Sequence, residues 1–332
     1  MKYINDSKDF DVAISTRVRI ARNLKDFKFP HMLEEKDANK VLSAIEKAVD
    51  KNEYNFLRTE NIDETNLYSL VEKHLISPDF VNYNDTAIIE NKDESLVAMV
   101  NEEDHLRMQA FASGFNVDEC YKKVKQFENN LSEKLEFAKS DKYGYLTSCP
   151  TNVGTAMRVS VLLHLQGLAS VGRLEDILNQ VRDIGLSVRG LYGENTSGFG
   201  NMYQISNQKT LGLSEEDIIN KVSLVVSSII EQEKMARDIL LKRKKVDFED
   251  KIYRAYGTLK YARKLSQDEV YKLLATLRIG ASMGYFDKIT LAKIQDLMDN
   301  TKSNTFKIII KEDVDKKDEE RKIAEYIRKE LD

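Results

Sequence analysis

Five arginines in this sequence stand where phosphate chemistry would need them. The chain uses arginine sparingly, with 16 arginines and 35 lysines making up its 51 basic residues. A guanidinium group stays charged, binds two phosphate oxygens at once and keeps its planar geometry when it is partly buried. A single arginine on a strand is most often a solvated surface residue, but five of them beside glycine-rich turns predict a polyphosphate site. They are Arg17, Arg19, Arg107, Arg158 and Arg189.

Most of these arginines belong to stretches in which apolar and polar residues alternate. In residues 14–20 the isoleucines and the valine share one side, and both arginines lie on the other. The same period of two recurs in residues 101–111 and 155–165. This period is typical of a strand with one buried side. We therefore expect strands that present arginines from the polar face of a sheet.

Two adjacent acids, Glu102 and Glu103, come shortly before Arg107. Successive residues of a strand point to opposite faces, so only one acid can share the side of Arg107, and the period assigns Glu103 to it. An acidic run is usually only a charged turn. This one gains interest because it stands close to an arginine of the phosphate-binding type.

Cys149 and His74 are weaker candidates. A lone cysteine is usually a small buried apolar residue, but a turn near several arginines could expose and activate its thiolate. His74 lies near the end of a predicted helix, where a solvated surface histidine is the default. The sequence has no G-x-x-x-x-G-K-[ST] loop and no protein-kinase catalytic loop. Any bound nucleotide must therefore be held by arginine side chains.

The elements that must position these side chains change in type along the chain. Predicted strands and helices are mixed up to about residue 230, where the mixed part ends within a long helix that starts at a Ser-x-x-Asp cap on Ser214. Further helices are expected over 248–279, 287–299 and 317–331. The pattern predicts an α+β catalytic domain over residues 1–232 and a helical C-terminal domain over residues 233–332.

Composition excludes several classes of protein. The 332 residues carry 51 basic and 55 acidic side chains, so the net charge of −4 does not suggest a nucleic-acid-binding protein. No apolar run approaches the roughly 18 residues of a membrane span, and the N-terminus lacks a secretory segment. The only cysteines, Cys120 and Cys149, lack the spacing of metal ligands. We expect a cytoplasmic protein.

Four motifs together resemble the ATP:guanido phosphotransferases, the family of the creatine and arginine kinases. Their length, order and spread make the resemblance specific. They are STRVRIARN at 15–23, NEEDHLR at 101–107, CPTNVGTAMR at 149–158 and RGLYGE at 189–194. The sequence is more similar to the bacterial protein arginine kinases. The first motif begins at residue 15, which leaves no room for the helical N-terminal domain of small-molecule phosphagen kinases, and YGTLKYARK at 256–264 also resembles that branch.

The resemblance implies a phosphagen-kinase catalytic domain, with a central, mostly antiparallel sheet flanked by helices, followed by a helical domain. It implies transfer of the γ-phosphate of ATP, with Mg²⁺, to arginine guanidinium groups of proteins, which marks them for quality control or Clp-type degradation during stress. Two alternatives stay open. One is a kinase for free arginine or another small guanidine, and the other is a non-catalytic adaptor that binds nucleotide or phosphoarginine.

The resemblance also implies roles for individual residues. Glu103 would deprotonate the acceptor guanidinium, Glu194 would clamp it, and Glu102 would help to organise Mg²⁺ through water. Cys149 would lie beside the guanidinium and Asn152 would support its turn, and no residue would bind a metal directly. The implied ATP-binding residues are Ser15, Thr16, Arg17, Val18, Arg19, His74, Arg107, Arg158, Val159, Ser160, Val161, Leu162, Arg189, Gly190, Leu191, Tyr192 and Gly193.

The sequence departs from the family pattern at two places. Relatives carry another acid shortly after YGE, whereas this chain has the uncharged residues 195–198. Protein arginine kinases also carry an R-D-x-x-R-A motif that binds phosphoarginine. Its best match begins at Arg321, where Lys322 and Glu325 replace the acid and the second arginine. We therefore expect a degraded phosphoarginine pocket.

Partners follow from the resemblance alone. It implies protein substrates with exposed arginines, including a stress-response repressor, a zinc-binding activator protein and a Clp-type unfoldase. Neither nucleic acid nor a membrane is expected as a partner. A homodimer through the helical tail is left open.

Overall fold

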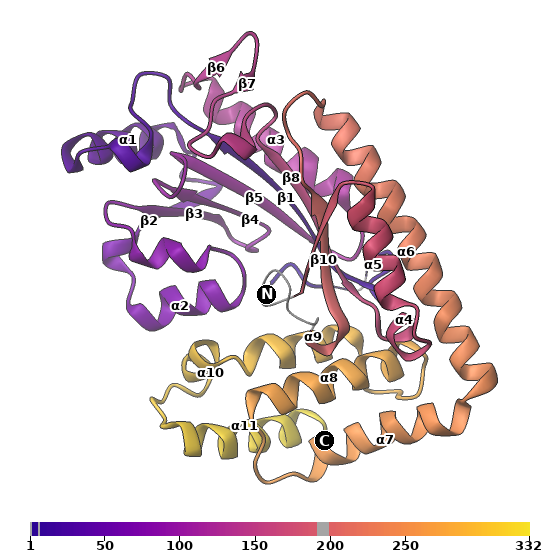
Figure 1. Ribbon diagram of the computed structural model, residues 1–332. Coiled ribbons are helices and arrows are strands. Elements are labelled where there is room, and N and C mark those ends of the chain that lie inside the picture. The colour runs from indigo at the N-terminus through magenta and orange to yellow at the C-terminus, as the bar shows by residue number, and fades with distance from the viewer. Residues whose placement is uncertain (1, 6, 191–198) are drawn as a thin grey trace.

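A single eight-stranded antiparallel sheet organises the first two thirds of the chain (Figure 1). The computed structural model describes residues 2–5, 7–190 and 199–332. The strand order is β2-β3-β4-β5-β1-β8-β10-β9, and a separate small hairpin joins β6 to β7. The strands are β1 Ala13–Arg22, β2 Tyr54–Arg58, β3 Ala87–Asn91, β4 Leu96–Val100, β5 Leu106–Ser113, β6 Lys139–Ser140, β7 Gly144–Tyr145, β8 Met157–His164, β9 Leu186–Gly190 and β10 Met202–Asn207. The predicted α+β fold with a central antiparallel sheet is confirmed.

One face of this sheet is packed against helices. Apolar side chains at alternate positions of the central strands, such as Val18, Met108 and Val159, form the main core with these helices. The alternation seen in the sequence is therefore that of a sheet with one fully buried side. The helices are α1 Glu35–Ala48, α3 Val117–Ser132, α5 Leu174–Asp183 and α6 Glu215–Arg243.

The opposite face is only partly covered. Helix α2, Glu64–Glu72, and the 3-10 turn that follows it pack on the β3–β4 side around Phe80 and Met99. The C-terminal helices pack near Ile14 and Met202. The middle of this face, between the two contacts, is left for the polar residues of the strands.

The C-terminal region is a layer of five helices beside the sheet, drawn in orange and yellow in Figure 1. They are α7 Lys245–Tyr261, α8 Gln267–Ser282, α9 Leu291–Asn300, α10 Ser303–Ile310 and α11 Lys316–Glu330. The helical stretch expected over 248–279 is divided between α7 and α8. Ala262 leaves the helical conformation, and the Ser266 side chain caps a new helix by accepting from the Glu269 amide. Helix α10 was not expected from the sequence.

Remaining short elements connect these layers. They are helix α4 Gln166–Ser170 and the 3-10 turns Pro30–Met32, Thr59–Asn61, Pro78–Asn82, Pro150–Asn152 and Phe199–Asn201. No helix in the described ranges is long and apolar enough to cross a membrane.

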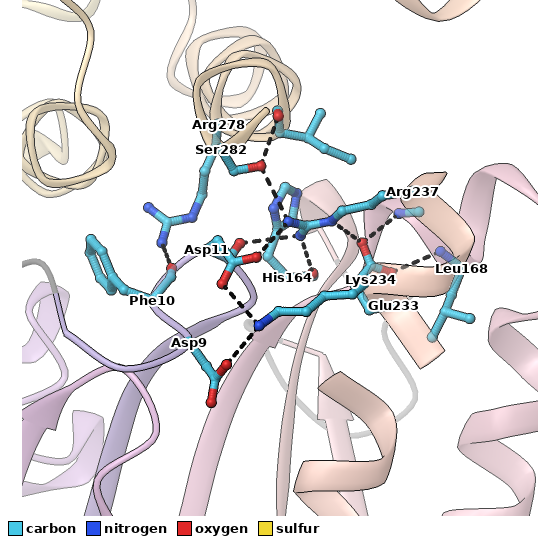
Figure 2. Close-up of polar contacts among 12 residues, drawn as sticks. Asp9, Phe10, Asp11, His164, Leu168, Glu233, Lys234, Arg237, Arg278 and Ser282 are labelled. Carbon is cyan, nitrogen blue, oxygen red and sulfur yellow. Dashed lines mark hydrogen bonds and ion pairs between the residues drawn. The ribbon is translucent and has the colours of Figure 1, made fainter. Parts of the chain in front are cut away.

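A buried ionic cluster joins the sheet to the helical layer, as Figure 2 shows. Arg237 of α6 donates to Glu233 at 2.8 Å, to Asp11 at 3.2 Å and to the Ser282 hydroxyl of α8 at 3.2 Å. Glu233 in turn accepts from the amides of Gly167 and Leu168, both at 2.8 Å. The cluster therefore ties α6, the N-terminal segment, α4 and α8 together.

Helix α6 also runs through the predicted domain boundary at 232/233. Its buried side chains up to Ala236 belong to the core of the sheet, and Leu240 packs with α7 and α8. The two-domain division stays a prediction, with α6 as the element shared by both parts.

Candidate active site

The strand register brings the five predicted arginines to one face of the sheet. Residues directly opposite each other in antiparallel strands share a face. Arg19 lies opposite Arg158, and Arg107 lies opposite Ala21, two residues along β1 from Arg19. Arg189 lies opposite Gln204, which is itself opposite Leu162 of β8. We call Arg17, Arg19, Arg107, Arg158 and Arg189 the arginine cluster.

Mutual repulsion marks this cluster as a site for a polyanion. Burial, followed by the charges of Arg107 and Arg158, lowers the pKa of Arg17 to about 10. Burial and the charges of Arg107, Arg17 and Arg158 lower the pKa of Arg19 well below its usual value. The lowered pKa values show that the fold withdraws these two guanidinium groups from water first of all, and that it also holds them near other positive charges. A triphosphate would relieve this repulsion.

Only alternate residues of the predicted ATP-binding segments face this cluster. Val18, Val159 and Val161 point into the main core on the other side of the sheet. Thr16 is buried there as well, and its hydroxyl donates to the Gly114 carbonyl at 2.6 Å. The pleat of a strand leaves Ser15, Arg17, Arg19, Arg158, Ser160 and Leu162 on the arginine side.

Glu102, and not Glu103, holds the guanidinium of Arg107. Both carboxylate oxygens of Glu102 accept from Arg107 Nη1, at 2.6 and 2.7 Å, and the Ser77 hydroxyl donates to the same carboxylate at 2.5 Å. Burial would raise the pKa of Glu102, but Arg107 and Ser77 outweigh it and lower that pKa. The period of two does not apply to these acids, because β5 begins only at Leu106 and both acids lie in the preceding bend.

Glu103 is half-buried beside the turn that carries Cys149. The side-chain Nδ2 of Asn152 donates to the Glu103 carboxylate at 3.4 Å. The backbone N–H of Asn152 donates to the Cys149 carbonyl at 3.0 Å. Burial, Asp104 and Glu102 together raise the pKa of Glu103 despite the nearby Arg107. A raised carboxylate pKa suits a group that must accept a proton. The structure therefore brings Glu103, Asn152 and Cys149 together.

Two recesses adjoin the candidate site residues. The first lies beside Glu103 and includes Pro30, Leu33 and Tyr83 among its lining residues. The second lies beside Arg17 and contains His74, which follows α2 in a left-handed conformation with φ of 58°. Loss of surrounding water and the charges of Lys302 and Arg17 lower the pKa of His74 to about 3, so its ring is neutral.

His105 is a structural residue. It is fully buried, and its Nδ1 accepts from the Leu24 amide at 3.0 Å. Burial lowers its pKa to about 4. The sequence pattern had set His105 on the side of Arg107, but the bend before β5 turns it toward Leu24.

Some predicted residues lie elsewhere. Leu191, Tyr192, Gly193 and Glu194 fall outside the described residues, whereas Arg189 and Gly190 end β9. On α11, Arg321 pairs with Asp318 at 3.5 Å and Lys322 pairs with Glu312, while Glu325 is exposed. None of these three α11 residues lines the recess beside Arg17 or the one beside Glu103.

Three supporting residues escaped sequence analysis. Ser77 binds Glu102, Gln109 accepts from Arg17 at 3.4 Å, and the Asn207 carbonyl accepts from Arg158 at 3.4 Å. Only Gln109 had a signal in the sequence, since it shares the polar side of β5 with Arg107.

The acids at the edge of the arginine cluster are compatible with Mg²⁺ bound through a nucleotide. Carboxylate oxygens are ligands that Mg²⁺ accepts, but the ion usually keeps several waters and phosphate oxygens. Within the described part of the chain, no group of three or more His, Cys, Asp or Glu side chains could hold a metal ion. A Mg²⁺ ion here would take most of its ligands from phosphate and water, with Glu102 and Glu103 nearby.

Comparison with known proteins gives two family matches. Residues 36–236 match the model of the ATP:guanido phosphotransferase C-terminal catalytic domain, and residues 245–332 match that of the protein-arginine kinase McsB C-terminal domain. The chain is 40% identical to a protein-arginine kinase of Clostridium acetobutylicum over 333 residues, covering 98% of both chains. It is 38% identical to one of Bacillus cereus over 299 residues, covering 88% of this chain and 84% of that one.

Solved structures of guanidine kinases share the fold. A duplicated taurocyamine kinase from Schistosoma mansoni with bound transition state analog components has a TM-score of 0.61 and 32% identity. The match covers 70% of this chain and 34% of that chain. A lombricine kinase has the same TM-score of 0.61 with 24% identity, covering 70% of this chain and 68% of that chain.

Proposed function

Because the chain belongs to the ATP:guanido phosphotransferase family, we infer that it is a protein-arginine kinase. It transfers the γ-phosphate of ATP to the guanidinium group of arginine side chains in proteins. Relatives named protein-arginine kinase match along almost its whole length, and the helical region matches the C-terminal domain of those kinases. The observation that carries the proposal is the arginine cluster with the raised-pKa carboxylate of Glu103 close to Arg107.

The arginine cluster is proposed to hold the triphosphate of ATP. Phosphoryl transfer depends mainly on positioning and on stabilising charge in the transition state. Preorganised guanidinium groups do both, because their repulsion in the free protein is relieved when phosphate charge arrives. Glu102 fixes Arg107 in place for this role. Bound with the nucleotide, Mg²⁺ would neutralise phosphate charge.

Glu103 is proposed to act on the acceptor. A guanidinium keeps its proton far above neutral pH and so has no free lone pair with which to attack phosphorus. As a guanidinium nitrogen bonds to the γ-phosphorus, the bond to the β,γ-bridging oxygen breaks, ADP leaves and a proton passes to Glu103. Asn152 donates to this carboxylate, and Cys149 belongs to the same turn as Asn152. We propose that Glu194 is the second carboxylate that holds the acceptor guanidinium.

The recess beside Glu103 supports a protein acceptor. Its lining residues Pro30, Leu33 and Tyr83 offer an apolar surface to residues next to the target arginine, which free arginine lacks. Exposed residues such as Met32 and Tyr83 border the same region. A kinase for free arginine and a non-catalytic adaptor remain the alternatives. A non-catalytic adaptor would not need a proton acceptor such as Glu103.

Further parts of the proposal rest on family resemblance. They are a zinc-binding activator, a Clp-type unfoldase that receives marked substrates, a cytoplasmic setting and a homodimer. The altered residues Lys322 and Glu325 lead us to propose that phosphoarginine no longer regulates the enzyme through α11.

The proposed function is tested by mass spectrometry under non-acidic conditions. The protein is incubated with Mg-ATP and either an unfolded arginine-rich protein or free arginine. We expect phosphate on arginine of the protein and much slower turnover of free arginine. Faster turnover of free arginine would favour the small-guanidine kinase, and tight ATP binding without transfer would favour the adaptor.

A further inference from the structure

The helical C-terminal domain forms one wall of the recess beside Arg17. The recess has a cavity volume of about 90 Å³ and is open to solvent at its mouth. Ser15, Arg17 and Ser160 line it from the sheet, while Tyr271 of α8 and Gln295 of α9 line it from the helical domain. Arg17 also belongs to the arginine cluster. A nucleotide with its phosphates on the cluster would therefore extend its nucleoside into this recess.

The walls of the recess suit a flat aromatic base. Leu162 and Phe111 supply apolar surface from the sheet, and the neutral ring of His74 stands at the edge. The Tyr271 hydroxyl donates to the sulfur of Met202 at 2.9 Å, which fixes another aromatic ring in the wall. Aromatic and apolar walls with a few placed polar groups are typical of small-molecule sites.

Two of the residues that line the recess each carry a buried polar atom without a hydrogen-bond partner among the described residues. These atoms are the Ser160 hydroxyl and Gln295 Oε1, on side chains that are 2% and 6% exposed. Leaving a buried polar atom unpaired destabilises the folded protein. Both atoms therefore point to a ligand that supplies their partners.

The side-chain amide of Gln295 is held in one orientation. Its Nε2 donates to Asp299 Oδ2 at 3.3 Å, and Asp299 Oδ1 pairs with Lys302 at 3.1 Å. An ionised carboxylate can only accept, so the amide nitrogen must face Asp299. Gln295 therefore keeps its oxygen, a pure acceptor, turned away from Asp299 and without a partner among the described residues.

We propose that Gln295 determines nucleotide specificity by accepting a hydrogen bond from the 6-amino group of adenine. This inference rests on the proposed function, which makes ATP the phosphate donor. A purine with oxygen at position 6 would place one acceptor against another, and Asp299 prevents the amide from turning to correct this. The helical domain thus takes part in choosing the nucleotide, in addition to the catalytic domain that holds its phosphates.

The test compares ATP with inosine triphosphate, which has oxygen in place of the 6-amino group. Dissociation constants for both nucleotides, and their KM and kcat values with a protein acceptor, are measured for the full chain. We expect the wild type to prefer ATP by at least about tenfold, the value of one hydrogen bond. Gln295→Met should weaken ATP binding and bring the two nucleotides within about threefold, with kcat for ATP changed less than KM.

A matched control is Gln267→Met, the same substitution in α8, where Nε2 donates to Glu319 at 3.1 Å, away from the recess. It should keep the wild-type preference. Equal binding of the two nucleotides by the wild type would overturn the proposal, and so would an unchanged preference in a folded Gln295→Met protein. If the Gln295→Met protein does not fold, the comparison of ATP with inosine triphosphate in the wild type tests the proposal by itself. Failure to phosphorylate proteins would count against the proposed function but would not remove a measured ATP preference.

Discussion

Arg19 of β1 and Arg158 of β8 lie directly opposite each other in the antiparallel register. Opposite residues on one face of such a pair have Cβ atoms about 4.5–5.5 Å apart, and like charges there destabilise the sheet. The lowered pKa of Arg19 reflects its burial and the charges of its arginine neighbours, Arg158 among them. The fold therefore maintains a repulsive pair in the middle of its sheet, at the point where the arginine cluster would meet phosphate.

Replacing Arg19 should separate stability from function. We expect Arg19→Gln to raise the melting temperature without nucleotide by about 1–3 °C, because one repelling charge is removed. The same change should lower kcat/KM by at least about 100-fold and reduce stabilisation by ATP. Thermal melting with and without Mg-ATP checks both. The exposed Arg173→Gln serves as control, and a lower melting temperature for free Arg19→Gln would contradict the argument.

The acid limb of the pH profile should report Glu103. Its pKa is raised in the folded protein, so kcat/KM should fall with decreasing pH already above the ordinary glutamate range. Glu103→Gln should lower kcat by about 10²–10⁴-fold and abolish that limb. A profile unchanged in Glu103→Gln would exclude this carboxylate as the proton acceptor.

The same substitution has a predicted effect on stability. A raised folded pKa means that ionised Glu103 costs stability above that pKa, whereas below the unfolded pKa of about 4.5 the carboxyl is protonated in both states. Glu103→Gln should therefore raise the melting temperature at pH 8 by about 1–3 °C and have no such benefit at pH 4. The exposed Glu60→Gln is the control, since it should show no pH-dependent difference.

Glu72 should hold the helical domain on α2. Its carboxylate accepts from the amides of Asn304 and Thr305 at the start of α10, both at 2.8 Å, and from both of their side chains. Glu72→Ala should cost about 2–3 kcal/mol of unfolding free energy and raise KM for ATP, because His74 and Lys302 lie close by. Hydrogen exchange should become faster in residues 303–310. Glu64→Ala, at the exposed start of the same helix, should leave exchange there unchanged.

The buried ionic cluster of Figure 2 should depend on Arg237 for its stability. Arg237→Met leaves the buried Glu233 without its cation and should cost about 3–5 kcal/mol of unfolding free energy. The double variant Glu233→Met, Arg237→Met should cost less than the sum of the two single changes. Denaturant unfolding measures both. Lys234→Met, which removes a more exposed ion pair with Asp9, should cost under about 1 kcal/mol, and strict additivity would contradict the coupling.

Much of the site could be predicted from local pattern. The period of two around Arg17, Arg107 and Arg158 predicted strands with one buried side, and the structure has β1, β5 and β8 there. Periodicity succeeds because it depends only on the geometry of a strand and on which side is buried. The strand period did not extend to Glu102 and Glu103, where the chain bends before β5. The helical pattern did not show the break at residues 262–266, after which a cap begins a new helix.

The sequence by itself pointed to the residues that we propose carry the chemistry, namely the arginines and Glu103, and to the motifs that resemble a family. Only the tertiary structure decided which of them meet. The strand register placed Arg19 opposite Arg158. The bend before β5 allowed Glu102 to accept hydrogen bonds from Arg107. The packing of α9 brought Gln295 to the recess beside Arg17. Such contacts join residues far apart in the chain. They depend on packing between elements, which leaves no period in the sequence.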